Sequence, residues 1–148
     1  MTASDPAASQ PDLTRFIDAQ NPVYDDVVAE LRSGRKRTHW MWFIFPQLAG
    51  LGHSPTARHF AIHDLAEAGR YLTHPVLGAR LVECAGILLQ LEGRTAHDIF
   101  GSPDDIKLRS SMTLFATADA ASRAFAEVLQ KYFGAERDTR TLELLRGG

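Results

Sequence analysis

The chain has 148 residues, with 16 lysines and arginines against 18 aspartates and glutamates and a formal net charge of −2. This balance argues against a general nucleic-acid binder, which is usually strongly basic, while 45% hydrophobic and 23% charged residues are typical of a soluble globular protein. The single cysteine, Cys84, excludes an internal disulfide and fits a reducing cytoplasm.

Residues 1–11 are small and polar and include prolines. We expect them to form a disordered N-terminal lead-in, followed by one domain over residues 12–148. The lead-in lacks the basic start and apolar stretch of a secretory signal. No run in the chain approaches the ~20 apolar residues that cross a bilayer. We therefore expect a cytoplasmic protein with no membrane partner, and the oligomeric state is left open.

Helix-start signals recur along the chain, each a capping residue, often followed by proline, ahead of an apolar face at helical spacing. Asp64 and Glu67 also have the spacing of a capping box. Two glycines, Gly34 and Gly134, stand just past predicted helix ends. The predicted starts are at Asp12, Asn21 with Pro22, Ser54 with Pro55, Asp64, His74 with Pro75, Ser102 with Pro103, Asp119 and Asp138.

The segment from residue 40 to residue 45 is ambiguous, because a short all-apolar run fits either a buried strand or a buried helix. A lone strand would have no partner, so we predict a helix there. No segment shows clean polar–apolar alternation. The sequence therefore predicts an all-α fold, a compact irregular bundle of about eight or nine short helices.

Several blocks resemble a known family. They read HWMWFIFPQL at 39–48, YLTHPVLGARL at 71–81, IFGSPDDIKLRSSMTLF at 99–115 and DTRTL at 138–142. In this order they resemble the DUF1810 family of bacterial and fungal domains of unknown function, from about residue 13 to residue 145. The resemblance implies a single all-helical domain and no established activity.

Two groups of cations each precede an apolar or aromatic run. The first is Arg35, Lys36 and Arg37, and the second is Lys107 and Arg109. If the two runs pack together, the charged ends meet at one cleft, where arginine and lysine are suited to a phosphate or carboxylate. The alternative is that these cations are solvated or pair with nearby acids, which charge runs usually do.

We therefore predict a small anionic ligand, phosphate-bearing or nucleotide-like, in a cleft between the Trp40 segment and residues 107–115. A tryptophan can stack a base or ring, and a histidine near neutrality is the residue type best suited to acid–base chemistry. His39 would carry such chemistry if any occurs. The predicted roles are Arg37, Lys107 and Arg109 for the anion, Trp40 or Trp42 for stacking, and His39 and Ser110 as polar orienters.

Other constellations are weaker. His59 and His63 are four residues apart and can share a helix face, but no third zinc ligand is evident, so we expect no metal site. Gly50 and Gly52 lack the dinucleotide fingerprint, and we expect no cofactor. The alternative function is a non-catalytic helical protein–protein interaction module, which a flat exposed apolar patch would favour.

Overall fold

The computed structural model describes residues 13–147, and the predicted lead-in at 1–11 and the predicted cap Asp12 lie outside them. The helices of the described part are α1 (Thr14–Gln20), α2 (Tyr24–Arg32), α3 (Met41–Ile44), α4 (Pro55–His59), α5 (Leu65–Thr73), α6 (Leu77–Gln90), α7 (Ala96–Phe100), α8 (Asp104–Ala118), α9 (Arg123–Phe133) and α10 (Thr139–Gly147).

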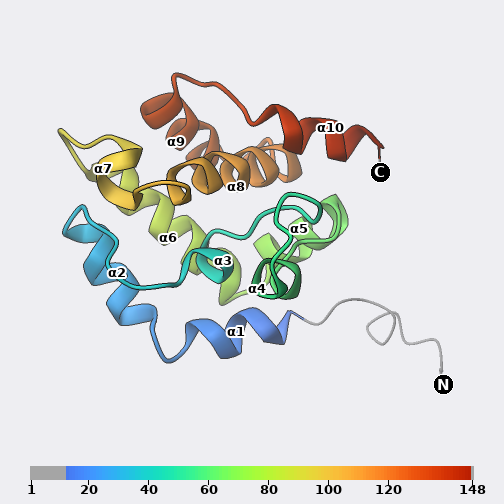
Figure 1. Ribbon diagram of the computed structural model, residues 1–148, viewed down its shortest axis with the longest axis horizontal. Helices are drawn as coiled ribbons and strands as arrows, with labels where there is room; N and C mark the ends of the chain where they lie inside the picture. Colours follow the sequence, from blue (N-terminus) through green and yellow to red (C-terminus); the bar gives the residue numbers. More distant parts are fainter. Residues whose placement is uncertain (1–12, 148) are drawn as a thin grey trace.

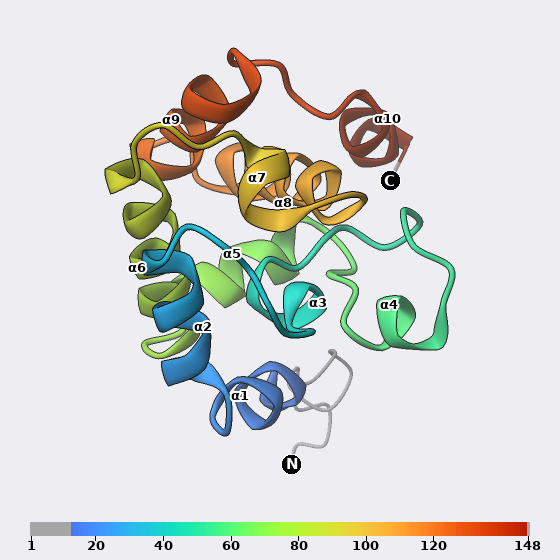
Figure 2. The same ribbon diagram turned by 60° about the vertical axis from the view of Figure 1, so that its left-hand side comes forward.

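The all-α prediction is confirmed. Ten helices are found over residues 13–147, slightly more than the eight or nine expected. Within the same residues, β pairing is limited to one isolated parallel bridge between Leu48 and Ile62. Figures 1 and 2 show short helices crossing at varied angles, with α1 and α10 on opposite sides of the molecule.

Several predicted helix ends are confirmed by their hydrogen bonds. The Ser54 hydroxyl accepts the Ala57 N–H at 3.1 Å, and Asp64 accepts the Glu67 N–H at 2.8 Å. Asp138 Oδ2 accepts both the N–H and the hydroxyl of Thr141, at 2.9 and 2.6 Å. These caps satisfy backbone donors that a helix leaves open at its N-terminus.

Other predicted starts are displaced. Asn21 ends α1 instead of capping α2, donating its N–H to Ile17, and α2 begins at Tyr24. Ser102 also fails to cap, because Pro103 occupies the position before α8. Asp119 accepts the Ala121 N–H in a turn, and α9 begins only at Arg123. A capping residue in the sequence therefore does not by itself fix the residue at which a helix begins.

The ambiguous apolar segment is helical. It forms α3, one turn from Met41 to Ile44, with Met41 and Ile44 buried. Phe45 leaves the helix at φ −122° and ψ 74°, outside the α region that the following Pro46 disfavours.

Helix α8 lies at the centre of the fold and contacts α5, α7, α9 and α10. Every residue from 110 to 116 is buried, unlike a surface helix with one apolar stripe, while the first turn of α8 is half-exposed. Its buried residues are Leu108, Ser110, Ser111, Met112, Thr113, Leu114, Phe115 and Ala116. The position of α8 places the start of this helix, with Lys107, beside the α3 segment.

Over the described residues, no single helix is long and apolar enough to span a membrane, although α5 and α6, joined by an 87° bend, would meet the length and composition criteria as a pair.

Candidate functional site

The backbone of the basic loop before α3 is held by Glu30 of α2. Glu30 Oε1 accepts the Arg37 N–H at 2.6 Å, the Thr38 N–H at 3.0 Å and the Trp40 indole N–H at 2.9 Å. Burial raises the pKa of Glu30, but these hydrogen bonds to the charged form outweigh it and lower the pKa to about 2. The loop is therefore fixed by its backbone, and the side chains of Arg37 and His39 lie exposed on it.

The two tryptophans of this segment have different environments. Trp40 is only 1% exposed and packs against Phe45 and Phe100, each with ring centroids 6.3 Å away. Trp42 is half-buried and lines a cavity. Trp42 is thus the tryptophan whose ring borders open space.

The cavity lies between α3, the loop after it, α4 and the first turns of α8. Its volume is about 400 Å³. Polar and aromatic groups of its lining are Trp42, Gln47, His53, Ser54, Lys107, Ser110 and Asp138. Three residues of the predicted site, Trp42, Lys107 and Ser110, therefore share this cavity. Arg37, His39, Trp40 and Arg109 are not among the described residues of its lining.

Lys107 has a defined place in the cavity wall. Its Nζ lies 5.3 Å from the centre of the Trp42 ring and 3.3 Å from Asp104 Oδ1. The other carboxylate oxygen, Asp104 Oδ2, lies 3.0 Å from Lys36 Nζ, and Lys36 in turn lies over the Trp40 ring at 5.2 Å. Two lysines thus share one carboxylate, and the cluster keeps one excess positive charge.

Ser110, Ser111 and Asp138 lie near Lys107 and differ in their hydrogen-bond partners. Ser110 donates to the Ile106 carbonyl at 3.3 Å, a long bond that leaves its oxygen free to accept. Ser111 is fully buried, and its hydroxyl has no partner among residues 13–147. Asp138 is committed to Thr141 at the start of α10.

Arg109 points to another part of the molecule. Its Nη1 lies 2.8 Å from Glu136 Oε1, and its guanidinium lies 5.9 Å from the Phe133 ring centre. The acid Glu136 is thus the partner of Arg109, on the loop after α9.

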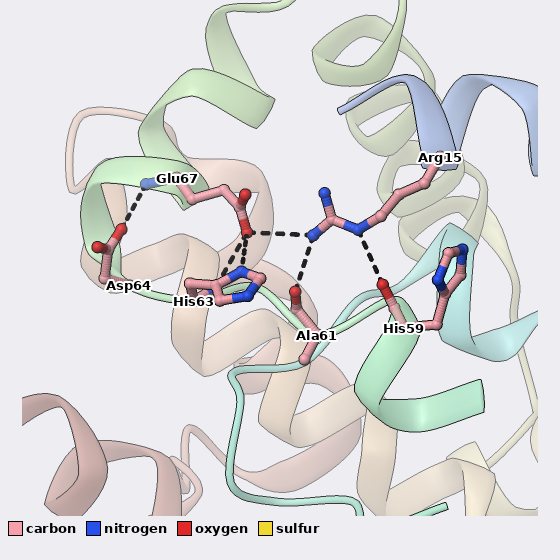
Figure 3. Close-up of polar contacts among 6 residues, drawn as sticks. All are labelled: Arg15, His59, Ala61, His63, Asp64 and Glu67. Atoms are coloured by element: carbon pink, nitrogen blue, oxygen red, sulfur yellow. Dashed lines mark hydrogen bonds and ion pairs between the residues drawn. The ribbon is translucent and has the colours of Figure 1, made fainter. Parts of the chain in front are cut away.

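A second cluster, which the sequence did not predict, surrounds Glu67 (Figure 3). Glu67 is fully buried, and its Oε1 accepts from Arg15 Nη2 at 3.2 Å, the His63 N–H at 2.9 Å and His63 Nδ1 at 3.1 Å. Arg15 also donates to the carbonyls of His59 and Ala61, at 2.9 and 2.8 Å. The cluster ties α1 to the segment between α4 and α5.

Part of this cluster had a signal in the sequence. The capping-box spacing of Asp64 and Glu67 is present, but only Asp64 caps, because the Glu67 side chain turns inward. His63 and Glu67 are also four residues apart, a spacing that pairs side chains on helices. No local pattern links Arg15 to Glu67 across more than 50 intervening positions, so the ion pair could not be inferred.

The structure also bears on two other kinds of chemistry, metal binding and reaction at a cysteine thiol. Over residues 13–147, no group of three or more His, Cys, Asp or Glu side chains could hold a metal ion. Cys84 is buried in α6, and burial raises the pKa of its thiol to about 12, so it is a core residue and not a reactive thiolate.

These features define a small all-helical protein with a tryptophan- and lysine-lined cavity beside its central helix. The chain belongs to the DUF1810 family, described as a protein of unknown function, whose family model matches residues 10–145. The resemblance seen in the sequence is thereby confirmed.

The chain is also similar in sequence and fold to a solved structure. The conserved hypothetical protein Rv1873 from Mycobacterium tuberculosis, whose crystal structure is known, has 57% sequence identity to this chain. The two structures superpose with a TM-score of 0.90, and the match covers 91% of this chain and 96% of Rv1873. None of the functionally curated proteins compared with the chain matches it.

Proposed function

We propose that the protein binds a small anionic ligand, phosphate-bearing or nucleotide-like, in the cavity between the α3 segment and the start of α8. The observation that carries this proposal is the position of Lys107, whose ammonium lies over the Trp42 ring in the cavity wall and shares Asp104 with Lys36. A cation and an aromatic ring side by side suit a ligand that has both a phosphate and a planar ring.

The charge balance favours an anion at this end of the cavity. The side chains of Lys36, Asp104 and Lys107 are 8%, 19% and 25% exposed, so water and salt screen them less than surface charges. Their excess positive charge attracts a phosphate to Lys107. The acid Asp138 also lines the cavity and repels an anion, which favours a position of the phosphate beside Lys107.

The size and remaining groups of the cavity agree with a small ligand. About 400 Å³ lies within the usual range of roughly 300–1,000 Å³ for small-molecule pockets. The Ser110 hydroxyl is available as an acceptor, and Gln47 supplies both an amide donor and an acceptor. These groups can orient a base or sugar, while Lys107 supplies the charge.

The test is a thermal-shift titration with nucleoside phosphates, sugar phosphates and inorganic phosphate. A ligand at one hundred times its dissociation constant stabilises the folded state by about 2.7 kcal/mol, which raises Tm by several degrees. We expect Lys107→Gln to remove most of this rise.

Lys131→Gln is the matched control, because the Lys131 ammonium also lies over an aromatic ring, Tyr132 at 5.4 Å, but outside the cavity lining. It should leave the ligand-induced rise unchanged. If no anion raises Tm, or if Lys107→Gln and wild type respond equally, the anion site is wrong and the interaction module is favoured. The exposed Ile106 beside Lys107, 51% accessible, would then be the residue to test in a partner surface.

A further inference from the structure

His63 lies at the junction of two hollows, away from the Trp42 cavity. One hollow, of about 800 Å³, lies between α1 and α4, and the other, of about 630 Å³, lies between the start of α5 and α10. His63 contributes to the lining of both. Its side chain is 52% exposed although its Nδ1 is bonded to the fully buried Glu67. One ring nitrogen is therefore held from inside, while the ring remains open to solvent.

Glu67 is itself held firmly. Asp64 fixes its backbone N–H at 2.8 Å, and the Arg15 guanidinium provides a permanent positive charge 3.2 Å from its Oε1. The same oxygen accepts the backbone N–H of His63, so the carboxylate and the histidine are joined twice (Figure 3). The imidazole cannot turn away from Glu67 without breaking a buried contact.

This arrangement selects one tautomer of His63. An ionised carboxylate only accepts hydrogen bonds, so Nδ1 of His63 must carry the proton that is donated to Glu67. The other nitrogen, Nε2, then carries a lone pair. A histidine whose Nδ1 is held by a carboxylate is oriented to accept a proton at Nε2, because the carboxylate stabilises the imidazolium that forms.

The hollow between α1 and α4 also offers a charge for a substrate. Its lining includes Arg58, for which no ion pair is found within residues 13–147. Arg15 in the same lining is already engaged by Glu67. Asp18 of α1 also lines the hollow and would repel a second negative charge. The hollow therefore suits a small molecule with one anionic group.

We propose that His63 is the proton acceptor of a second site, in the hollow between α1 and α4, with Glu67 as its positioning residue. The substrate carries one carboxylate or phosphate, which Arg58 binds, and a hydroxyl group or bound water that faces Nε2. In the step, the O–H proton moves to Nε2, the oxygen keeps the electron pair, and the imidazolium is held by Glu67. This site is separate from the Lys107 cavity and goes beyond the function proposed above.

The test measures the reactivity of each histidine toward diethyl pyrocarbonate by mass spectrometry of the whole protein. The Nε2 lone pair attacks the reagent's carbonyl carbon, ethyl carbonate leaves, and the Nδ1 proton is lost to solvent. His97 is the matched control, because its Nδ1 also faces a carboxylate, Asp105 at 3.4 Å, and its side chain is 70% exposed. Accessibility alone would make His97 the faster residue, whereas the proposal requires His63 to be faster.

Glu67→Gln should slow His63 by about tenfold, the lower range for partners that orient a histidine, and leave His97 unchanged. Because this variant removes a buried charge and can unfold the protein, two readouts on wild type stand beside it. Nitrogen NMR shifts should show His63 protonated at Nδ1. Inorganic phosphate should slow the modification of His63 and not that of His97.

Arg58→Gln should abolish the protection by phosphate, and Lys107→Gln should preserve it, which separates this site from the Lys107 cavity. The proposal is overturned if His63 reacts no faster than His97, or if its neutral form is protonated at Nε2. It is also overturned if phosphate protects equally after Arg58→Gln.

Discussion

Glu30 accepts the indole N–H of Trp40 at 2.9 Å and so connects α2 to the residue that precedes α3. The same carboxylate holds the backbone of Arg37 and Thr38. The backbone of a run of cations that passes directly into the core is thus positioned by a carboxylate from another helix.

Glu30→Gln should destabilise the protein by about 2 kcal/mol at pH 7, the scale of hydrogen bonds to a charged group. The pKa of Glu30 is lowered from 4.5 to about 2, so its contribution is fully present above the unfolded pKa and is lost as pH falls through 2. Urea unfolding of both proteins at pH 7, 4 and 2.5 measures this. A difference that stays constant from pH 7 to pH 2.5 would contradict the assignment.

Substitution of the two tryptophans by alanine should lower the free energy of unfolding by clearly different amounts. Trp40→Ala should cost about 3–5 kcal/mol, as expected for a fully buried aromatic, because Trp40 is 1% exposed. Trp42→Ala should cost only about 1–2 kcal/mol, because one side of its ring borders the cavity. Chemical denaturation of the two variants decides this, and equal losses would mean that Trp42 is packed as tightly as Trp40.

Two glycines of α6 provide a matched pair. A Cβ at Gly78 would lie 2.0 Å from the Leu72 carbonyl oxygen, a backbone atom that cannot move aside easily. Gly78→Ala should therefore cost about 1–3 kcal/mol or more through overpacking. Gly86→Ala, with nothing within 4 Å, should instead stabilise the helix by about 0.5–1 kcal/mol. Thermal unfolding compares them, and a stabilising Gly78→Ala would disprove the close approach of α5 and α6.

Arg15 and Glu67 should behave as a coupled pair. Arg15→Met alone leaves a buried carboxylate without its counter-charge, and we expect a loss of about 3–5 kcal/mol. The double variant Arg15→Met with Glu67→Met should lose less than the sum of the single variants, with a coupling energy of about 0.5–3 kcal/mol. Denaturant titration of the full cycle gives this energy. Strictly additive losses would show that the two side chains do not depend on each other.

The helical content and several boundaries could be predicted from the sequence because they depend on neighbours in the chain. Ser54 and Asp138 each reach a donor three residues away, so their role is visible in a short pattern. Asn21 and Ser102 have equally good cap signatures but do not cap, because Asn21 ends α1 and Pro103, not Ser102, stands directly before α8. Which residue ends one helix and which begins the next depends on the backbone conformation of the turn between them. Composition and residue spacing do not determine that conformation.

The candidate sites likewise contain some contacts that the sequence predicted and others that it did not. That Lys107 would approach the Trp42 segment followed from two apolar runs packing together. Arg109 instead points toward Glu136, because residues two apart on an α-helix are rotated by about 200° and do not share a face. The Arg15–Glu67 pair depends on α1 lying against the start of α5, a tertiary contact without a local pattern.

The burial of α8 has a consequence for dynamics. Residues 110–116 of α8 are enclosed by neighbouring helices, so we expect their amide hydrogens to exchange with solvent at rates close to that of global unfolding. Lys107 lies three residues before this stretch, in the half-buried start of α8, whereas Trp42 lies in the single-turn helix α3. The α8 wall of the cavity is therefore anchored to the slowest-exchanging part of the core, and we expect adaptation to a ligand to occur mainly in α3 and the loop that follows it.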